Sequence, residues 1–108
     1  MAKLLNEIKA SVELSDGDAV FTLRKPTNEE LNNFLAKRYE VSRKGKDVRD
    51  NSLQSRVELF DQLLVKVENL EDGNGQPITT ADKAQIPANW KADIIFKSFE
   101  DNEITIKN

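Results

Sequence analysis

The chain contains neither cysteine nor histidine among its 108 residues. Without cysteine there is no disulfide and no thiolate metal site, and the composition says nothing of the redox compartment. Without histidine the chain lacks the most common general base, the most common metal ligand and the side chain that titrates nearest neutral pH. We therefore expect a protein that holds no cofactor and no metal.

Long apolar runs and a strong charge of one sign are also missing. Residues 1–14 contain no apolar stretch of signal-peptide length, and no segment approaches the length of a membrane span. The net charge of −3 is too small to indicate a polyanionic or polycationic partner. A chain of this length forms one domain around one core. We expect a single soluble domain over residues 1–108, in the cytoplasm and away from membranes.

No constellation of catalytic residues replaces the missing histidine. Carboxylates are plentiful, but nothing in the sequence marks a pair of them as desolvated and ready for acid–base chemistry. No glycine-rich loop has a phosphate-binding spacing, and serine has no histidine to activate it. Because a function must be argued from a site, the sequence predicts a protein that is not an enzyme.

Two alternating segments near the N-terminus predict a β-hairpin. Apolar residues occupy every second position in both segments: Ile8, Ala10, Val12 and Leu14, then Ala19, Phe21 and Leu23. Ser15, Asp16 and Gly17 between them have the chemistry of a tight turn. We predict antiparallel strands at about 7–14 and 19–25. An isolated hairpin is only marginally stable in water, so helices must cover its apolar face.

Three main helices are predicted, over about 28–43, 51–68 and 87–100, which makes the fold class α+β. The first begins with a capping box, in which Thr27 is the N-cap and Glu30 reaches back. Its expected buried face consists of Leu31, Phe34, Leu35 and Tyr39. The third is expected to start at Pro87, a residue favoured at the first helical position.

The second helix is the best amphipathic segment of the chain. Its apolar stripe consists of Leu53, Val57, Phe60, Leu63, Leu64 and Val67. Val65 lies off this stripe, and the alternation of Val65 and Val67 with Lys66 and Glu68 leaves an extended end as the alternative. We favour the helix.

The remaining segments are predicted to be loops. A flexible connector is expected over about 43–51, one short helical turn at 79–83, and a polar C-terminal tail in which Ile104 and Ile106 are candidates for an edge strand. The loop 71–77 superficially resembles a calcium site, but an EF-hand needs glycine and glutamate where this chain has Pro77 and Lys83. We expect a surface turn there.

A basic cluster lies between the first two helices. It consists of Lys37, Arg38, Arg43, Lys44, Lys46 and Arg49, with only Glu40 and Asp47 to offset them. Nucleic-acid binders usually combine such a patch with stacking aromatics or a basic domain, and this domain is acidic. A solvated connector is the favoured interpretation. Electrostatic contact with an acidic protein explains the same charges, whereas a nucleic-acid partner is not expected.

The last helix carries more apolar surface than one core contact requires. Ala88, Ala92, Ile95 and Phe99 share one face, while Trp90 and Ile94 form a second and Phe96 lies to the side of the first. Aromatic stripes are usually core. The functional alternative is a protein-docking face with Trp90, Ile94 and Phe96 as anchors, because tryptophan and phenylalanine are favoured in such contacts.

Two stretches are similar to the phage tail assembly chaperones. The first is Phe21-Thr22-Leu23-Arg24-Lys25-Pro26-Thr27, which precedes an acidic-capped helix, and the second is the loop from Val67 to Ile78 followed by a closing helix at about 87–99. The similarity of order and spacing covers residues 19–99. The long polar connector between the first two helices departs from the family pattern.

The resemblance implies a non-enzymatic protein of the host cytoplasm that coats the tape-measure protein and recruits tail-tube subunits, then leaves before the particle matures. The family has no shared catalytic residues to carry over. On this hypothesis Trp90, Ile94 and Phe96 anchor a partner helix and the basic cluster steers it, with homo-oligomers also compatible. The alternatives are a structural tail component, such as a connector or completion protein, and a small bacterial regulatory or nucleic-acid-binding domain.

Overall fold

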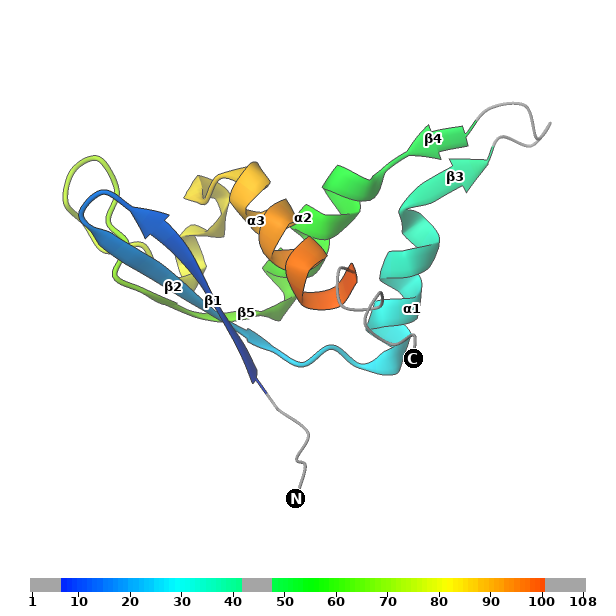
Figure 1. The fold of residues 1–108 in the computed structure, drawn as a ribbon, viewed down its shortest axis with the longest axis horizontal. Coiled ribbons are helices and arrows are strands. Elements are labelled where there is room, and N and C mark those ends of the chain that lie inside the picture. Colours follow the sequence, from blue (N-terminus) through cyan, green and yellow to red (C-terminus); the bar gives the residue numbers. More distant parts are fainter. Residues whose placement is uncertain (1–6, 42–47, 101–108) are drawn as a thin grey trace, which may run out of the picture.

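The N-terminal hairpin forms the first two strands of the main sheet (Figure 1). The computed structural model describes residues 7–41 and 48–100. In it, β1 (Glu7–Leu14) and β2 (Gly17–Arg24) pair antiparallel without interruption. Gly17 has a φ of 135°, a backbone conformation that glycine adopts without steric cost. The predicted hairpin is confirmed, with the second strand beginning two residues earlier than expected.

A third strand, β5 (Leu64–Glu68), pairs antiparallel with the other edge of β2, so the strand order is β1-β2-β5. The predicted helix over 51–68 is therefore too long: α2 (Ser52–Leu63) ends where Leu64 turns to extended angles, φ −66° and ψ 123°. The free edge of β2 supplies ladder hydrogen bonds, and the β-branched Val65 and Val67 favour a strand. The extended alternative holds for this segment.

The predicted capping box at the start of α1 (Asn28–Lys37) is confirmed. The Glu30 backbone N–H donates to Thr27 Oγ1 at 3.1 Å, and the Thr27 N–H donates to Glu30 Oε1 at 2.9 Å. The Arg24 guanidinium also donates to both carboxylate oxygens of Glu30, at 2.8 and 2.7 Å. The hydrogen bonds from Arg24, and then that from the Thr27 backbone, lower the pKa of Glu30 to about 2.

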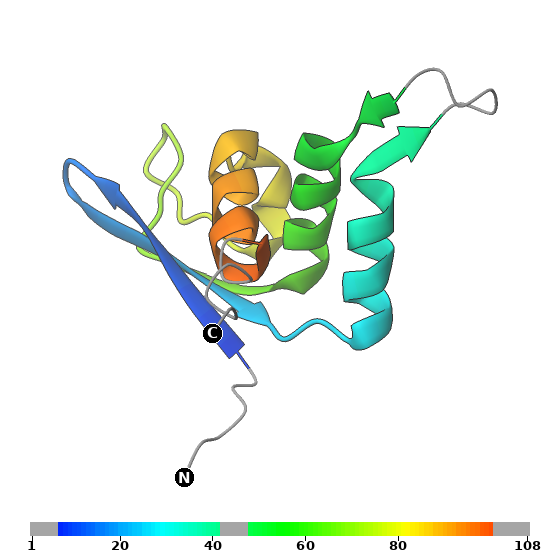
Figure 2. The same ribbon diagram turned by 45° about the vertical axis from the view of Figure 1, so that its right-hand side comes forward.

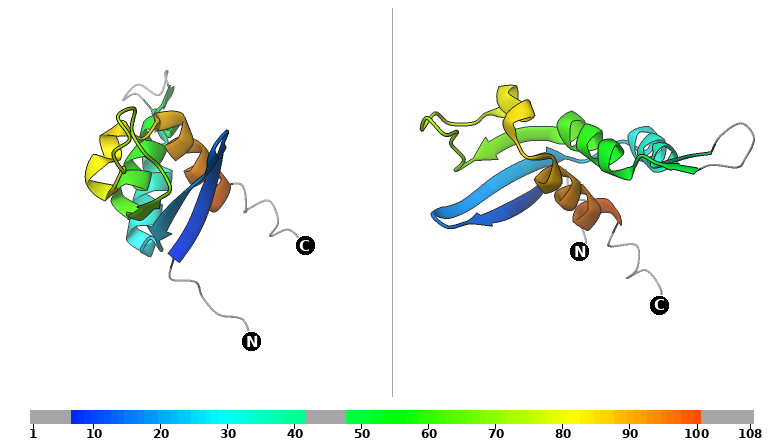
Figure 3. Two further views of the ribbon diagram at one scale, coloured as in Figure 1. Left: turned by 90° about the vertical axis from the view of Figure 1, so that its left-hand side faces the viewer. Right: turned by 90° about the horizontal axis from the view of Figure 1, so that it is seen from above.

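Helix α1 ends at Lys37, not near residue 43 as predicted, and a second antiparallel pair follows. It consists of β3 (Tyr39–Val41) and β4 (Val48–Asp50), closed at its base by a 2.7 Å hydrogen bond from the Asn51 N–H to the Arg38 carbonyl. Part of the expected connector is therefore strand, and residues 42–47 lie outside the described residues. Pairing with a distant segment overrode the local helical pattern. Figure 3 shows this arm pointing away from the main sheet.

The third predicted helix is confirmed as α3 (Ala88–Ile95), which continues into the π-helical turn η2 (Phe96–Glu100). It begins one residue later than predicted, because Pro87 has an extended ψ of 137° and is the N-cap. Before it, the 3-10 helix η1 (Thr80–Gln85) overlaps the short helical turn expected at 79–83, with Thr79 as its N-cap. The proposed edge strand at Ile104 and Ile106 lies outside the described residues. The fold class is α+β, as predicted. Within the described ranges, no helix has the length and apolarity needed to cross a membrane.

Helices α2 and α3 pack on the same face of the sheet, and α1 lies on the far side of α2 (Figure 2). The fully buried ring of Phe21 meets Phe60 of α2 at a centroid distance of 5.7 Å and Trp90 of α3 at 6.4 Å, both edge-on. Such edge-to-face pairs add to the burial of the rings themselves. One strand residue therefore joins the sheet to both covering helices.

Two predicted helix faces are rotated relative to the core. In α2 the buried residues are Ser55, Leu59, Phe60 and Leu63, while Leu53 is 56% exposed. In α1 only Phe34 is buried, Leu35 is 38% exposed, and Tyr39 belongs to β3. Helix α2 contacts α1, α3 and β2 at once, and α1 contacts α2. The positions of these neighbours, which the sequence pattern does not contain, decide which side of each helix is buried.

The capping box provides a direct test of how much α1 contributes to stability. We expect Thr27→Ala to lower the free energy of unfolding by about 1 kcal/mol, because the Glu30 N–H loses its acceptor at the helix start. The exposed Asn32→Ala in the same helix is the matched control and is expected to be near neutral. Urea denaturation of the two variants measures the difference. Equal stabilities would show that the cap contributes nothing.

Candidate functional site

The three aromatic and aliphatic anchors predicted in the last helix have different environments. Ile94 is 5% exposed and belongs to the hydrophobic core, so its side chain is not available on the surface of a monomer. Trp90 is partly buried, edge-on against Phe21. Phe96 is 40% exposed. The structure therefore divides the predicted docking face, leaving Trp90 on one side of α3 and Phe96 on another.

Phe96 lies beside an exposed part of α2. The guanidinium carbon of Arg56 lies 5.3 Å from the centroid of the Phe96 ring, within the range of a cation–π contact. Leu53 precedes Arg56 by three residues, which places the two side chains next to each other on the helix surface. Val57, one turn after Leu53, is half-buried. We call Leu53, Val57 and Phe96 the Phe96 surface.

The end of η2 is tied to the other two helices by a buried carboxylate. The Glu100 side chain, 6% exposed, accepts hydrogen bonds from Arg56 Nε at 2.6 Å, Arg56 Nη2 at 3.0 Å and Arg38 Nη1 at 2.8 Å. The hydrogen bonds from Arg56 are the main reason that the pKa of Glu100 lies below its usual value, with Arg38 adding to the effect. Burial opposes this shift but is outweighed. The network positions Arg56 next to the Phe96 ring.

The predicted basic cluster is not a single surface in the described residues. Lys37 is exposed on α1, whereas Arg38 binds Glu100 and lies 5.9 Å from the Phe34 ring centroid. Arg49 is in β4, on the arm that leaves the body of the fold. The other three members, Arg43, Lys44 and Lys46, lie outside the described residues. One of the six charges therefore has a structural role that the sequence did not reveal.

A second buried charge pair joins α2 to α3. Lys91, with a side chain 5% exposed, places its Nζ 2.8 Å from Asp61 Oδ1 and 5.9 Å from the centroid of the Phe60 ring. Lys83 Nζ donates to the Asp61 carbonyl at 2.5 Å. Neither Lys91 nor Glu100 stood out in the sequence, because lysine and glutamate on a helix usually lie on its exposed side. The two side chains are buried because α2 packs against α3.

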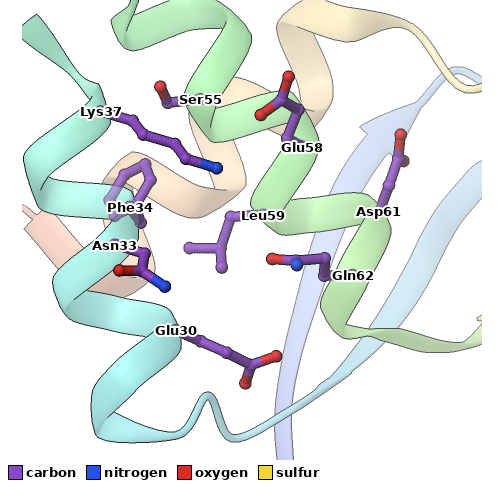
Figure 4. A pocket seen from close by; sticks show the side chains of 9 residues that line it. All are labelled: Glu30, Asn33, Phe34, Lys37, Ser55, Glu58, Leu59, Asp61 and Gln62. Carbon is purple, nitrogen blue, oxygen red and sulfur yellow. The ribbon is translucent and has the colours of Figure 1, made fainter.

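A cleft of about 410 Å³ lies between α1 and α2. Figure 4 shows Lys37 reaching from α1 towards α2, while Leu59 and Gln62 point from α2 into the gap. Its carboxylates each have a partner: Glu30 is bound by Arg24, Asp61 by Lys91, and Glu58 accepts a 3.1 Å hydrogen bond from Gln54. The cleft thus offers a mixed polar surface without the close pair of carboxylates that acid–base chemistry uses.

The loop 71–77 is organised by its own carboxylate. Asp72 Oδ1 accepts hydrogen bonds from the backbone N–H groups of Asn74, at 2.8 Å, and Gln76, at 3.0 Å. This is a turn-forming use of an aspartate. Across residues 7–41 and 48–100, no group of three or more aspartates and glutamates has the arrangement of a metal site.

A groove of about 560 Å³ separates α3 from the outer part of β1. Its lining consists of Ser11, Val12 and Glu13 on the strand and Asn89, Trp90, Asp93 and Lys97 on the helix. Helix α3 thus leaves this length of β1 accessible, and the partly buried Trp90 forms part of the wall.

Comparisons with known proteins add no family to this description. No family model matches the chain, and neither a curated protein nor a solved structure matches it. The functional argument therefore depends on the two surfaces that α3 presents, the groove beside β1 and the Phe96 surface beside α2.

The Glu100 network gives a stability prediction. We expect Glu100→Gln to lower the free energy of unfolding by about 1.5–3 kcal/mol at pH 7, because hydrogen bonds to two guanidinium groups lose their charged acceptor. Asp93→Asn, which removes the exposed partner of Lys97 on the same segment, is the matched control and should change stability little. Denaturant unfolding of both variants measures the effect.

The pH dependence of the same two proteins, the parent and Glu100→Gln, tests whether the charge of Glu100 is the cause of the stability difference. The pKa of Glu100 in the folded chain lies below its ordinary value of 4.5, so its contribution is complete above that pH and is lost as the pH falls below it. The difference in stability between the parent and Glu100→Gln should therefore shrink on acidification. A difference that stays constant from neutral to acid pH would contradict this assignment.

Proposed function

We propose that this chain is a non-enzymatic protein-interaction module that acts as a tail assembly chaperone, binding the tape-measure and tail-tube proteins of a phage or prophage. The proposal combines the similarity of two stretches, Phe21 to Thr27 and Val67 to Ile78, with the Phe96 surface. It places the protein in the host cytoplasm during assembly. The partners are other proteins, and the contact needs no cofactor.

The observation that carries the proposal is the exposure of Phe96. Ile94 and Ile95, which precede it in the sequence, are buried, whereas the Phe96 side chain is 40% exposed. On the neighbouring helix α2, Leu53 is 56% exposed. Exposed aromatic rings and arginines are enriched at the centres of contacts between proteins.

The shape of this surface favours a helix as its partner. Leu53, Val57 and Phe96 lie on two packed helices, and a partner helix presents apolar side chains at positions i, i+3, i+4 and i+7 to such a surface. The Arg56 guanidinium adds positive charge beside the ring, which favours an acidic segment in the partner. A contact centred on a few exposed apolar side chains fits the small, reversible class of interfaces. Reversibility suits a protein that must leave before the particle matures.

Phe96→Ser tests the proposed contact. The parent chain is co-expressed with a tape-measure protein and a tail-tube protein, and the complexes are isolated by affinity capture and size exclusion. We expect the parent to hold a tape-measure fragment in solution and Phe96→Ser to weaken binding at least about tenfold, as for loss of an interface anchor. Leu35→Ser on α1, a similarly exposed apolar residue, is the matched control and should bind normally.

Thermal unfolding of both variants separates binding from folding. If the parent binds neither protein, the chaperone function is wrong. If the parent binds and both variants bind equally well, the function stands but the Phe96 surface is not the contact. Recovery of the chain in purified mature particles would instead indicate the structural tail component.

A further inference from the structure

Strand β1 is an edge strand of the sheet. All of Glu7–Leu14 pairs with β2 in one continuous register, and the only irregularity of the sheet lies between β2 and β5, at Thr22 and Leu23. Within residues 7–41 and 48–100, no other strand pairs with the outer edge of β1. Natural proteins protect such an edge with charged side chains, a bulge or proline, short length or a covering segment, because its free N–H and C=O groups invite another strand. Of these protections β1 has the charged side chains of Glu7, Lys9 and Glu13 but neither a bulge nor a proline.

The apolar side chains of β1 are also incompletely covered. Ile8, Ala10, Val12 and Leu14 are all partly exposed, although they face the same core as the fully buried Ala19, Phe21 and Leu23 of β2. The groove between Ser11–Glu13 and α3 leaves room beside the strand. An added strand would bring apolar residues next to these side chains and under Trp90. Figure 3 shows β1 at the outer rim of the sheet.

We infer that two copies of this chain pair through β1, antiparallel to each other, so that two three-stranded sheets join into one of six strands. The alternating charges of the strand select the second copy as the occupant. The outward-facing residues of β1 are Glu7, Lys9, Ser11 and Glu13. When two copies pair about a two-fold axis at Ser11, Lys9 of each lies opposite Glu13 of the other.

The neighbouring registers are less favourable. An axis at Ala10 sets Glu7 opposite Glu13, and an axis at Lys9 sets two lysines opposite each other, both of which are repulsive. An axis at Val12 leaves Lys9 and Glu13 opposite serines, without an opposite charge. Registers shifted by one residue from those above would set the apolar residues of one strand opposite the polar residues of the other. Such registers are excluded, because directly opposed side chains point to the same face of a sheet.

The inner face agrees with the register that the charges select. With the axis at Ser11, Ile8 lies opposite Leu14 of the second copy and Ala10 lies opposite Val12. All four apolar positions of β1 therefore gain an apolar neighbour across the new strand pair. Charge and apolar pattern thus indicate one register.

The monomer itself offers Glu13 an unfavourable partner. In the hairpin Glu13 lies directly opposite Asp18, and like charges at opposed positions destabilise a sheet. Lys9 lies opposite the uncharged Thr22. Neither charge thus gains an opposite charge across the hairpin, whereas in the pair of chains each gains one. This pairing does not depend on the proposed chaperone function, because it uses the edge of β1 and not the Phe96 surface.

Charge reversal at these two positions tests the inference on the full chain. The association constant is measured by sedimentation over a range of protein concentrations. The parent chain is expected to dimerise reversibly. Lys9→Glu and Glu13→Lys should each raise the dimer Kd at least about tenfold, because each turns both opposite-charge contacts into like-charge contacts.

Mixing the two variants supplies the decisive comparison. A mixed dimer contains one Lys9→Glu chain and one Glu13→Lys chain, and both of its cross-strand pairs again join a carboxylate to an ammonium group. An equimolar mixture should therefore regain the affinity of the parent. Glu7→Lys, a charge reversal at a position that has no charged partner in this register, is the control and should leave the Kd unchanged. Slowed exchange of β1 backbone amides at high protein concentration is expected in parallel.

Three results would overturn the inference. One is a parent chain that stays monomeric at every concentration, which would leave the β1 edge to residues 101–108 or to another protein. Another is a dimer that neither charge reversal weakens. The third is a dimer lost in Phe96→Ser but retained in Lys9→Glu, which would move the interface to the Phe96 surface.

Discussion

The ring of Phe21, at the centre of the middle strand, is the contact on which the fold depends. It has no exposed surface, and it meets Phe60 of α2 and Trp90 of α3 edge-on from the same side of the sheet. Without this junction the hairpin would be two strands in water with an uncovered apolar face. The junction also explains why Trp90 is only partly available to a partner: much of its ring contributes to folding.

A second constraint acts along the contact between the two covering helices. Lys91 with Asp61 at one end and Arg56 with Glu100 at the other show that α2 and α3 run in opposite directions. Both pairs bury one charge, and removal of one partner from such a pair is costly because the other charge stays in the interior. Glu100 also binds Arg38 at the end of α1, so its carboxylate joins the segment after α3 to both α1 and α2.

These two constraints leave α3 with two accessible sides. On one side Trp90 lines the groove beside the free edge of β1, and on the other Phe96 lies next to Arg56. The buried side chains of Ile94 and Ile95 thus lie between the groove beside β1 and the Phe96 surface. The proposed pairing through β1 and the proposed partner contact through the Phe96 surface use different residues, so the two proposals are compatible.

Local chemistry determined part of this protein in advance. The hairpin, the Thr27 capping box, the loop at 71–77 and the start of the last helix were all readable from the sequence, because each depends on residues only a few positions apart. Tertiary structure decided the rest. Residues 64–68 became a strand because β2 had a free edge, and residues 39–41 became a strand because 48–50 lay opposite. Whether Ile94 was buried, Phe96 exposed or Arg38 bound to Glu100 depended on neighbours up to 62 positions away in the chain, whose approach leaves no local periodic signal.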